Sequence, residues 1–155
     1  MRDQLMRETI ALALENVRAG RGGPFAALVV KGEDVVGRGT NLVTASNDPT
    51  AHAEILAIRA ACKLLGVFHL SECEIYTSCE PCPMCLAAMY WARVRGFYYG
   101  SSRGEAAKFG FDDALIYDEL LRPPEERLVP GSRLLAEEAV KVFDEWEKSP
   151  VKVPY

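Results

Sequence analysis

Short apolar runs typical of β-strands alternate along this chain with longer segments of helical periodicity. Residues 25–30 and 34–41 are two such runs, and the Lys-Gly-Glu tripeptide between them predicts a β-hairpin. Two more runs, residues 73–78 and 94–100, each follow a segment whose apolar residues have helical spacing. Because strands separated by helices pack as layers around one sheet, the alternation predicts an α/β fold.

Two prolines predict where the central helices begin. Pro49 suits the first helical position and follows Asp48, a good N-cap, so this helix should cover residues 49–66. Pro83 opens a second helix over residues 83–93, which is apolar almost all round and is therefore expected to be buried. Further helices are expected at residues 5–17, 112–121 and 134–148.

The length and composition fit a single domain, which we expect to span residues 1–155. A chain of 155 residues with 49% hydrophobic content can bury one sizeable core. Its formal net charge of -4 is opposite in sign to that of most nucleic-acid-binding proteins, so no nucleic-acid partner is expected. The N-terminal segment has no apolar run that could serve as a signal peptide or membrane span, which predicts a cytoplasmic protein without a membrane partner.

Three of the five cysteines, Cys79, Cys82 and Cys85, lie close together. The odd count and this close spacing favour metal binding or catalysis over disulfides. Cys82 and Cys85 stand at a predicted helix start, where side chains three apart share a face and the helix dipole favours thiolates. His52 lies near the start of the preceding helix, with Glu54 two positions further on. We therefore expect the two helix starts to converge on one metal ion.

The type of metal site depends on Cys79. Imidazole and thiolate ligands suit zinc, and three protein ligands leave an open catalytic position, whereas four close the site. Glu80 and Pro81 turn the chain after Cys79, which counts against a fourth sulfur ligand but leaves that alternative open. Glu54 argues more strongly for an open site, because a carboxylate beside a ligand histidine can carry protons there.

Two motifs identify a known family. His-Ala-Glu at residues 52–54 and Pro-Cys-Pro-Met-Cys at residues 81–85 match the H-x-E and P-C-x-x-C signature of zinc-dependent nucleobase deaminases. On these motifs the chain resembles the cytidine deaminase superfamily. Within that superfamily, residues 46–63, 76–93 and 109–120 are similar to the bacterial guanine deaminase family.

The resemblance implies a fold, a cofactor and a reaction. The implied fold has three α/β/α layers around a five-stranded mixed sheet. The implied cofactor is one zinc ion per subunit, held by His52, Cys82 and Cys85 with a water as the fourth ligand, while Glu54 carries protons. The implied reaction is the hydrolytic deamination of guanine to xanthine and ammonia, in purine metabolism.

The same resemblance implies a purine base as the small-molecule substrate and a homodimer as the assembly. Asn41 and Asp113 match purine-binding positions of the family, and Phe25 is placed to pack on the ring. Tyr155 matches a terminal tyrosine that caps the pocket in related guanine deaminases. Their C-terminal segment, about residues 130–155 here, is exchanged between subunits, although part of this segment follows the family pattern poorly.

Each of these four residues also has a purely structural interpretation. Asp113 would suit a helix N-cap, and Phe25 would suit the core. Asn41 would satisfy loop backbone, and Tyr155 would be a frayed terminus.

Rival functions also remain open. Guanosine, cytosine or a tRNA adenosine is an alternative substrate. A zinc-stabilised binding module, in which Cys79 completes the metal site, is the non-enzymatic alternative.

Overall fold

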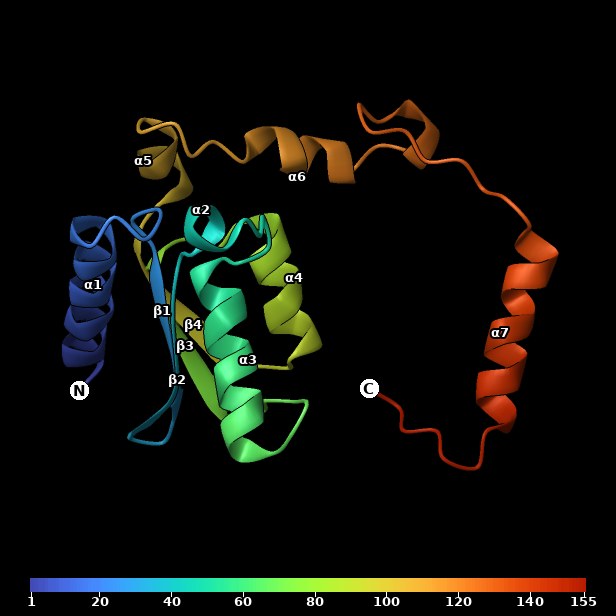
Figure 1. Ribbon diagram of the computed structural model, residues 1–155, viewed down its shortest axis with the longest axis horizontal. Helices are drawn as coiled ribbons and strands as arrows, with labels where there is room; N and C mark the ends of the chain where they lie inside the picture. Colours follow the sequence, from blue (N-terminus) through green and yellow to red (C-terminus); the bar gives the residue numbers. More distant parts are fainter. The chain divides into compact units, whose positions relative to one another are not determined.

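Strands β1 (Ala26–Lys31) and β2 (Asp34–Thr40) pair antiparallel and form the hairpin that the sequence predicts. Strand β1 also pairs antiparallel with β3 (Cys73–Cys79), which pairs parallel with β4 (Gly96–Ser101). The computed structural model, which describes residues 1–155, thus contains a mixed sheet in the order β2-β1-β3-β4 (Figure 1).

The expectation of a five-stranded sheet is wrong, because the sheet has four strands. After β4 the chain turns directly into helix. Ser102 caps α5 (Arg103–Ala107) through a capping box, in which Ser102 and Glu105 bond each other's backbone N–H groups. The regular structure beyond α5 is helical as well, so no later segment extends the sheet.

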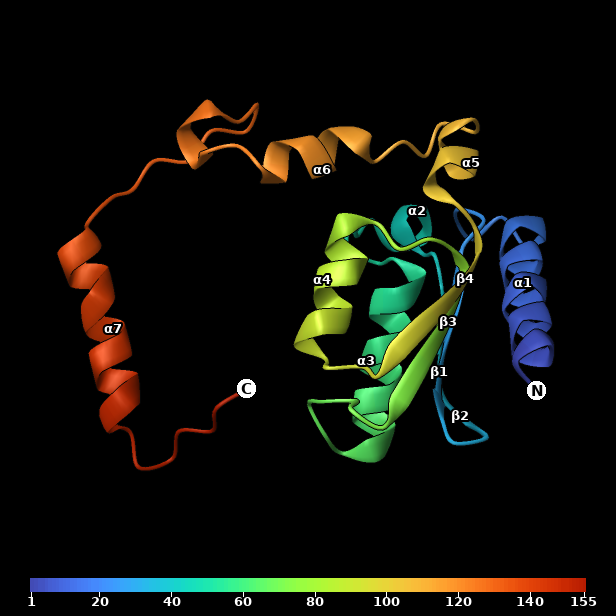
Figure 2. The ribbon, with the colours of Figure 1, turned by 180° about the vertical axis from the view of Figure 1, so that it is seen from behind.

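Helices cover both faces of the sheet, which gives the three layers expected from the resemblance. Helix α1 (Arg2–Arg18) lies on one face (Figures 1 and 2). Leu5 of this helix packs with Leu28 and Tyr76 of the sheet. Helices α3 (Ala53–Leu65) and α4 (Pro83–Trp91) lie on the other face and pack on the larger buried cluster. The remaining elements are α2 (Val43–Ser46), α6 (Ala114–Leu120), the 3-10 helix η1 (Pro124–Glu126) and α7 (Ala136–Lys148).

The chain divides into two compact units, Met1–Asp113 and Ala114–Tyr155. The first contains the sheet with α1 to α5, and the second contains α6, η1 and α7. The apolar side chains of α7, including Phe143 and Trp146, are exposed. That residues 1–155 act as one domain stays a prediction. No helix combines the length and the apolar composition needed to cross a membrane.

Glycines in β2 allow α3 to approach the sheet closely. A Cβ atom at Gly39 would overlap the carbonyl oxygen of Ala53, and one at Gly37 would overlap the carbonyl oxygen of Ala57. Helix α3 presents a row of small side chains to this strand, because Ala53, Ala57 and Ala61 recur four residues apart and are fully buried. This backbone-to-backbone packing fixes where the first turn of α3 lies.

The predicted start of this helix at Pro49 is wrong. The carboxylate of Asp48 accepts hydrogen bonds from the backbone N–H and the hydroxyl of Thr50, at 2.8 and 2.7 Å. Asp48 thus stabilises a local turn instead of capping the helix. Helix α3 begins at Ala53, with His52 as its N-cap in extended conformation.

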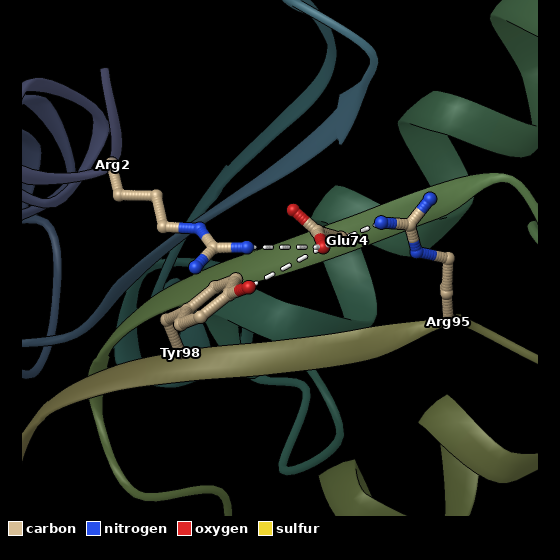
Figure 3. Close-up of polar contacts among 4 residues, drawn as sticks. All are labelled: Arg2, Glu74, Arg95 and Tyr98. Carbon is tan, nitrogen blue, oxygen red and sulfur yellow. Dashed lines mark hydrogen bonds and ion pairs between the residues drawn. The ribbon is translucent and has the colours of Figure 1, made fainter.

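A carboxylate on β3 links the start of α1 to the sheet. The Oε1 atom of Glu74 accepts a hydrogen bond from the Tyr98 hydroxyl at 3.3 Å and pairs with Arg95 at 3.5 Å (Figure 3). The Arg2 guanidinium lies 4.0 Å from the same oxygen and 4.7 Å from the centroid of the Tyr98 ring. Glu74 stands near the start of β3, whereas the cysteine motif follows the end of this strand.

Candidate active site

The starts of α3 and α4 bring the expected metal ligands together. His52 is the N-cap of α3, and Cys82 is the N-cap of α4, with Pro83 in the first turn as predicted. The Nδ1 atom of His52 lies 3.5 Å from the Sγ atoms of both Cys82 and Cys85. The three potential ligand atoms all lie within 4.8 Å of one another. One imidazole and two sulfurs at this spacing fit a zinc ion with an open fourth position.

Cys79 stands outside this group of ligand atoms. Its Sγ atom instead donates to the Ser102 carbonyl oxygen at 3.9 Å. Burial raises the pKa of the Cys79 thiol to about 11, so this group stays protonated at neutral pH. The geometry therefore favours the three-residue site over the closed site of the binding-module alternative.

The electrostatics among these side chains favour a thiolate at Cys82. A hydrogen bond from Cys85 lowers the pKa of the Cys82 thiol to about 4, and His52 acts in the same direction. The hydrogen bond to Cys82 raises the pKa of Cys85 as the donor of the pair, and the contact with Cys82 raises the pKa of His52. Zinc binding displaces such protons, because thiolate and neutral imidazole are the ligating forms.

Glu54 lies in the first turn of α3 and is buried beside the sulfurs. Its Oε2 atom lies 3.4 Å from the Cys85 Sγ atom, and its Oε1 atom accepts a hydrogen bond from the Thr77 hydroxyl at 3.2 Å. Burial raises the pKa of the Glu54 carboxyl above its usual range. A buried carboxyl of raised pKa beside a metal site is suited to accept and donate protons during a reaction.

Asn41 follows β2, and its backbone role is visible in the structure. Its Oδ1 atom accepts hydrogen bonds from the N–H groups of Gly23, at 3.2 Å, and Val43, at 3.3 Å. These bonds orient the side chain so that a ligand would be contacted through the amide nitrogen. The contact between Asn41 and a purine stays a prediction.

Phe25 lies directly before β1 and packs partly against the core. Its ring also meets that of Phe111 edge-to-face, with centroids 4.8 Å apart. Both rings belong to the first compact unit. Stacking of Phe25 on a substrate ring stays a prediction.

Asp113 and Tyr155 stand in different compact units. Asp113 directly precedes α6, and burial raises the pKa of its carboxyl while the positive charge of Arg103 opposes that shift. Tyr155 is the last residue of the second unit. The contacts of both residues with a substrate stay predictions.

Two residues with clear roles near the site were missed from the sequence. Thr77 contacts Glu54, and fully buried Asn16 donates to the carbonyl oxygens of Gly23 and Asn41, at 3.0 and 2.8 Å. Thr77 interrupts the inward-facing apolar row of β3, and this was the available signal. In α1 the apolar spacing indicated the wrong face, because Ile10, Leu14 and Val17 are exposed whereas Asn16 lies on the buried face.

The fold and the site together define the class of zinc-dependent hydrolytic deaminases. The chain belongs to the family described as cytidine and deoxycytidylate deaminase zinc-binding region, whose model matches residues 1–101.

The chain is also similar to individual known proteins. Guanine deaminase of Bacillus subtilis is 47% identical over 153 residues, which cover 99% of this chain and 98% of that protein. The X-ray structure of this enzyme superposes with a TM-score of 0.96 over the same shares of the two chains. The structure of NE0047 in complex with 2,6-diaminopurine has a TM-score of 0.67 and 36% identity, covering 70% of this chain and 61% of that one. A tRNA-specific adenosine deaminase of Agrobacterium fabrum is 43% identical, but over only 56% of this chain and 59% of its own.

Proposed function

We propose that the protein is a zinc-dependent guanine deaminase, which converts guanine and water to xanthine and ammonia. The observation that carries this proposal is the convergence of His52, Cys82 and Cys85 with the Glu54 carboxyl 3.4 Å from the Cys85 sulfur. The choice of guanine is supported by the near-complete coverage of the Bacillus subtilis guanine deaminase.

Glu54 performs the proton transfers in the proposed reaction. His52, Cys82 and Cys85 would hold the zinc ion, which would supply a Lewis acid that activates water at neutral pH. The Glu54 carboxylate accepts a proton from this water as its oxygen attacks C2 of guanine, and returns the proton to a ring nitrogen. Glu54 would then take the second proton from the hydroxyl added at C2 and deliver it to the amine on the same carbon. The C2–O bond becomes the carbonyl of xanthine as the C2–N bond breaks and ammonia leaves.

Substrate selection rests on polar groups that match the edge of guanine. The amide nitrogen of Asn41 would donate to the purine carbonyl, and the Asp113 carboxylate would accept from purine N–H groups. Phe25 would pack on the ring, and Tyr155 would cap the pocket. A site with such bonds discriminates against bases that leave its buried polar groups unpaired.

A homodimer with exchanged C-terminal segments, about residues 130–155, is part of this proposal. It is supported by the exposed apolar side chains of α7, since Val142, Phe143 and Trp146 would need a covering surface. Sedimentation equilibrium of the full chain tests the homodimer: a mass of twice 17.1 kDa is expected, and a monomer at micromolar concentration would contradict the dimer and the exchange that requires it.

An assay of the zinc-loaded protein with guanine, guanosine, cytosine and adenine tests the activity. Release of xanthine and ammonia from guanine is the expected result, with little turnover of the other three. Preference for guanosine would replace the proposed substrate with its nucleoside. Activity only on adenosine in tRNA would contradict the proposal. The formal net charge of -4 already disfavours a nucleic-acid substrate.

A further inference from the structure

Thr77 is a polar residue in a buried and otherwise apolar row of strand β3. Alternate residues of this strand, Cys73, Ile75 and Thr77, point toward α3 and α4, and the first two belong to the core cluster there. Thr77 is only 1% exposed. Burying a hydroxyl costs free energy unless the hydroxyl has a hydrogen-bond partner, so its contacts require an explanation.

The backbone of Thr77 is held from both sides. It pairs with Ala27 on β1 and with Tyr99 on β4, because β3 is an interior strand of the sheet. The side chain is β-branched, which restricts rotation about its first torsion. The hydroxyl oxygen of Thr77 is therefore a fixed point relative to the sheet.

This hydroxyl has two acceptors. Its Oγ1 atom lies 3.2 Å from the Oε1 atom of Glu54 and 3.0 Å from the carbonyl oxygen of Cys79. The hydroxyl has a single hydrogen, but it can also accept. It can therefore donate to an ionised Glu54 carboxylate, or accept from a protonated Glu54 carboxyl while donating to Cys79. A proton carrier passes through both forms in every reaction cycle, and Thr77 offers each form a hydrogen bond.

The contact also decides how the Glu54 carboxyl is turned. The last torsion of a glutamate has only a broad preference, so an unheld carboxyl group rotates. Here Thr77 holds Oε1, which leaves Oε2 beside the Cys85 sulfur at 3.4 Å. The oxygen on the side of the metal ligands is thus the one that faces the reaction.

We propose that Thr77 is a positioning residue for proton transfer by Glu54, an inference that rests on the proposed deaminase function. The Thr77 hydroxyl bonds Glu54 and the Cys79 carbonyl oxygen, and it bonds none of the three metal ligands. Its loss should therefore slow the chemical step without weakening substrate or zinc binding.

Thr77→Val tests this, because valine keeps the shape of the side chain and removes the hydroxyl. We expect kcat for guanine to fall about 10- to 100-fold, with KM and bound zinc unchanged. Thr77→Ser restores a hydroxyl and should recover most of the wild-type kcat. The matched control is Thr9→Val in α1, where the same change removes a fully buried hydroxyl that donates to the Leu5 carbonyl at 2.8 Å. This control should keep the wild-type kcat.

The outcomes separate this inference from the proposed function. A wild-type protein without guanine turnover overturns both. An active wild type with an unchanged kcat in Thr77→Val overturns only the role of Thr77. If Thr77→Val loses zinc or melts well below Thr9→Val, the serine variant decides. Normal zinc content with recovered kcat in Thr77→Ser supports the positioning role, and normal zinc content with low kcat overturns it.

Discussion

Gly39 of β2 and Ala53 of α3 approach so closely that a Cβ atom on the glycine would overlap the alanine carbonyl oxygen. Ala53 lies between His52 and Glu54, so this contact sets the height of the metal site above the sheet. The positions of the His52 and Glu54 side chains thus depend on the absence of a side chain at Gly39.

Gly39→Ala should therefore damage both stability and metal binding. The added methyl group must push the start of α3 away from β2, and overpacking of this kind costs about 1–3 kcal/mol. Thermal melting and a zinc titration measure the two effects. Gly96→Ala is the control, because a Cβ there has no neighbour within 4 Å. Equal behaviour of the two variants would contradict this interpretation.

Glu54→Gln should separate catalysis from folding. The amide keeps the size of the side chain but cannot carry a proton, so kcat should fall about 10²–10⁴-fold. Zinc content and melting temperature should stay near those of the wild type. Glu74→Gln is the control, because Glu74 is a partly buried carboxylate near the start of β3, away from the cysteine motif at the end of this strand. This change should leave kcat unaltered. Substantial turnover by Glu54→Gln would remove this residue from the mechanism.

The free energy of unfolding should fall at alkaline pH, because the buried thiol of Cys79 is harder to deprotonate in the folded chain than in the unfolded chain. Burial raises the pKa of this thiol from 9.0 to about 11 in the folded chain, so the unfolded chain loses this proton first. The contribution of the neutral thiol is present below pH 9 and is lost as the pH rises from 9 toward 11. Denaturant unfolding at several pH values measures it, with Cys79→Ala as the comparison. The decline over this window should be shallower in the variant, and identical slopes would rule out Cys79 as its source.

Asn16→Asp should disturb the loop that carries Asn41. The substitution replaces an N–H donor with an oxygen that faces the carbonyls of Gly23 and Asn41 in a fully buried place. Losing these bonds should cost about 1–3 kcal/mol, and KM for guanine should rise because Asn41 shifts. Exposed Asn47→Asp provides the control, since aspartate tolerates the left-handed backbone found there. An unchanged KM in a folded Asn16→Asp protein would disconnect Asn16 from the substrate site.

Local sequence signals were sufficient where one side chain had one available role. Pro83 and Cys82 start α4 as expected, because proline has no backbone N–H to lose in the first turn. Asp48 misled the prediction for α3, because its carboxylate has two possible partners and bonds Thr50. That competition is decided by the packing of α3 on β2, which depends on residues far apart in the chain.

The part of the site that belongs to the two sequence motifs was predictable. His52, Glu54, Cys82 and Cys85 followed from residue type and spacing, and the structure brings them together. The role of Thr77 could not be predicted in the same way, since no motif in the sequence around Thr77 indicates a contact with Glu54. Only the register of β3 within the sheet brings the two side chains into contact.

The order of the donors along the chain has a consequence for biosynthesis. His52 leaves the ribosome well before Cys85, which follows 33 positions later, and β3 lies between them. A nascent chain can offer an ion the lone imidazole or the Cys82–Cys85 pair, but the complete set forms only when β3 has joined the hairpin and brought the start of α4 to that of α3. Zinc bound by all three residues would therefore report an assembled sheet, because a chain in which β3 has not paired keeps the imidazole and the two sulfurs on separate segments.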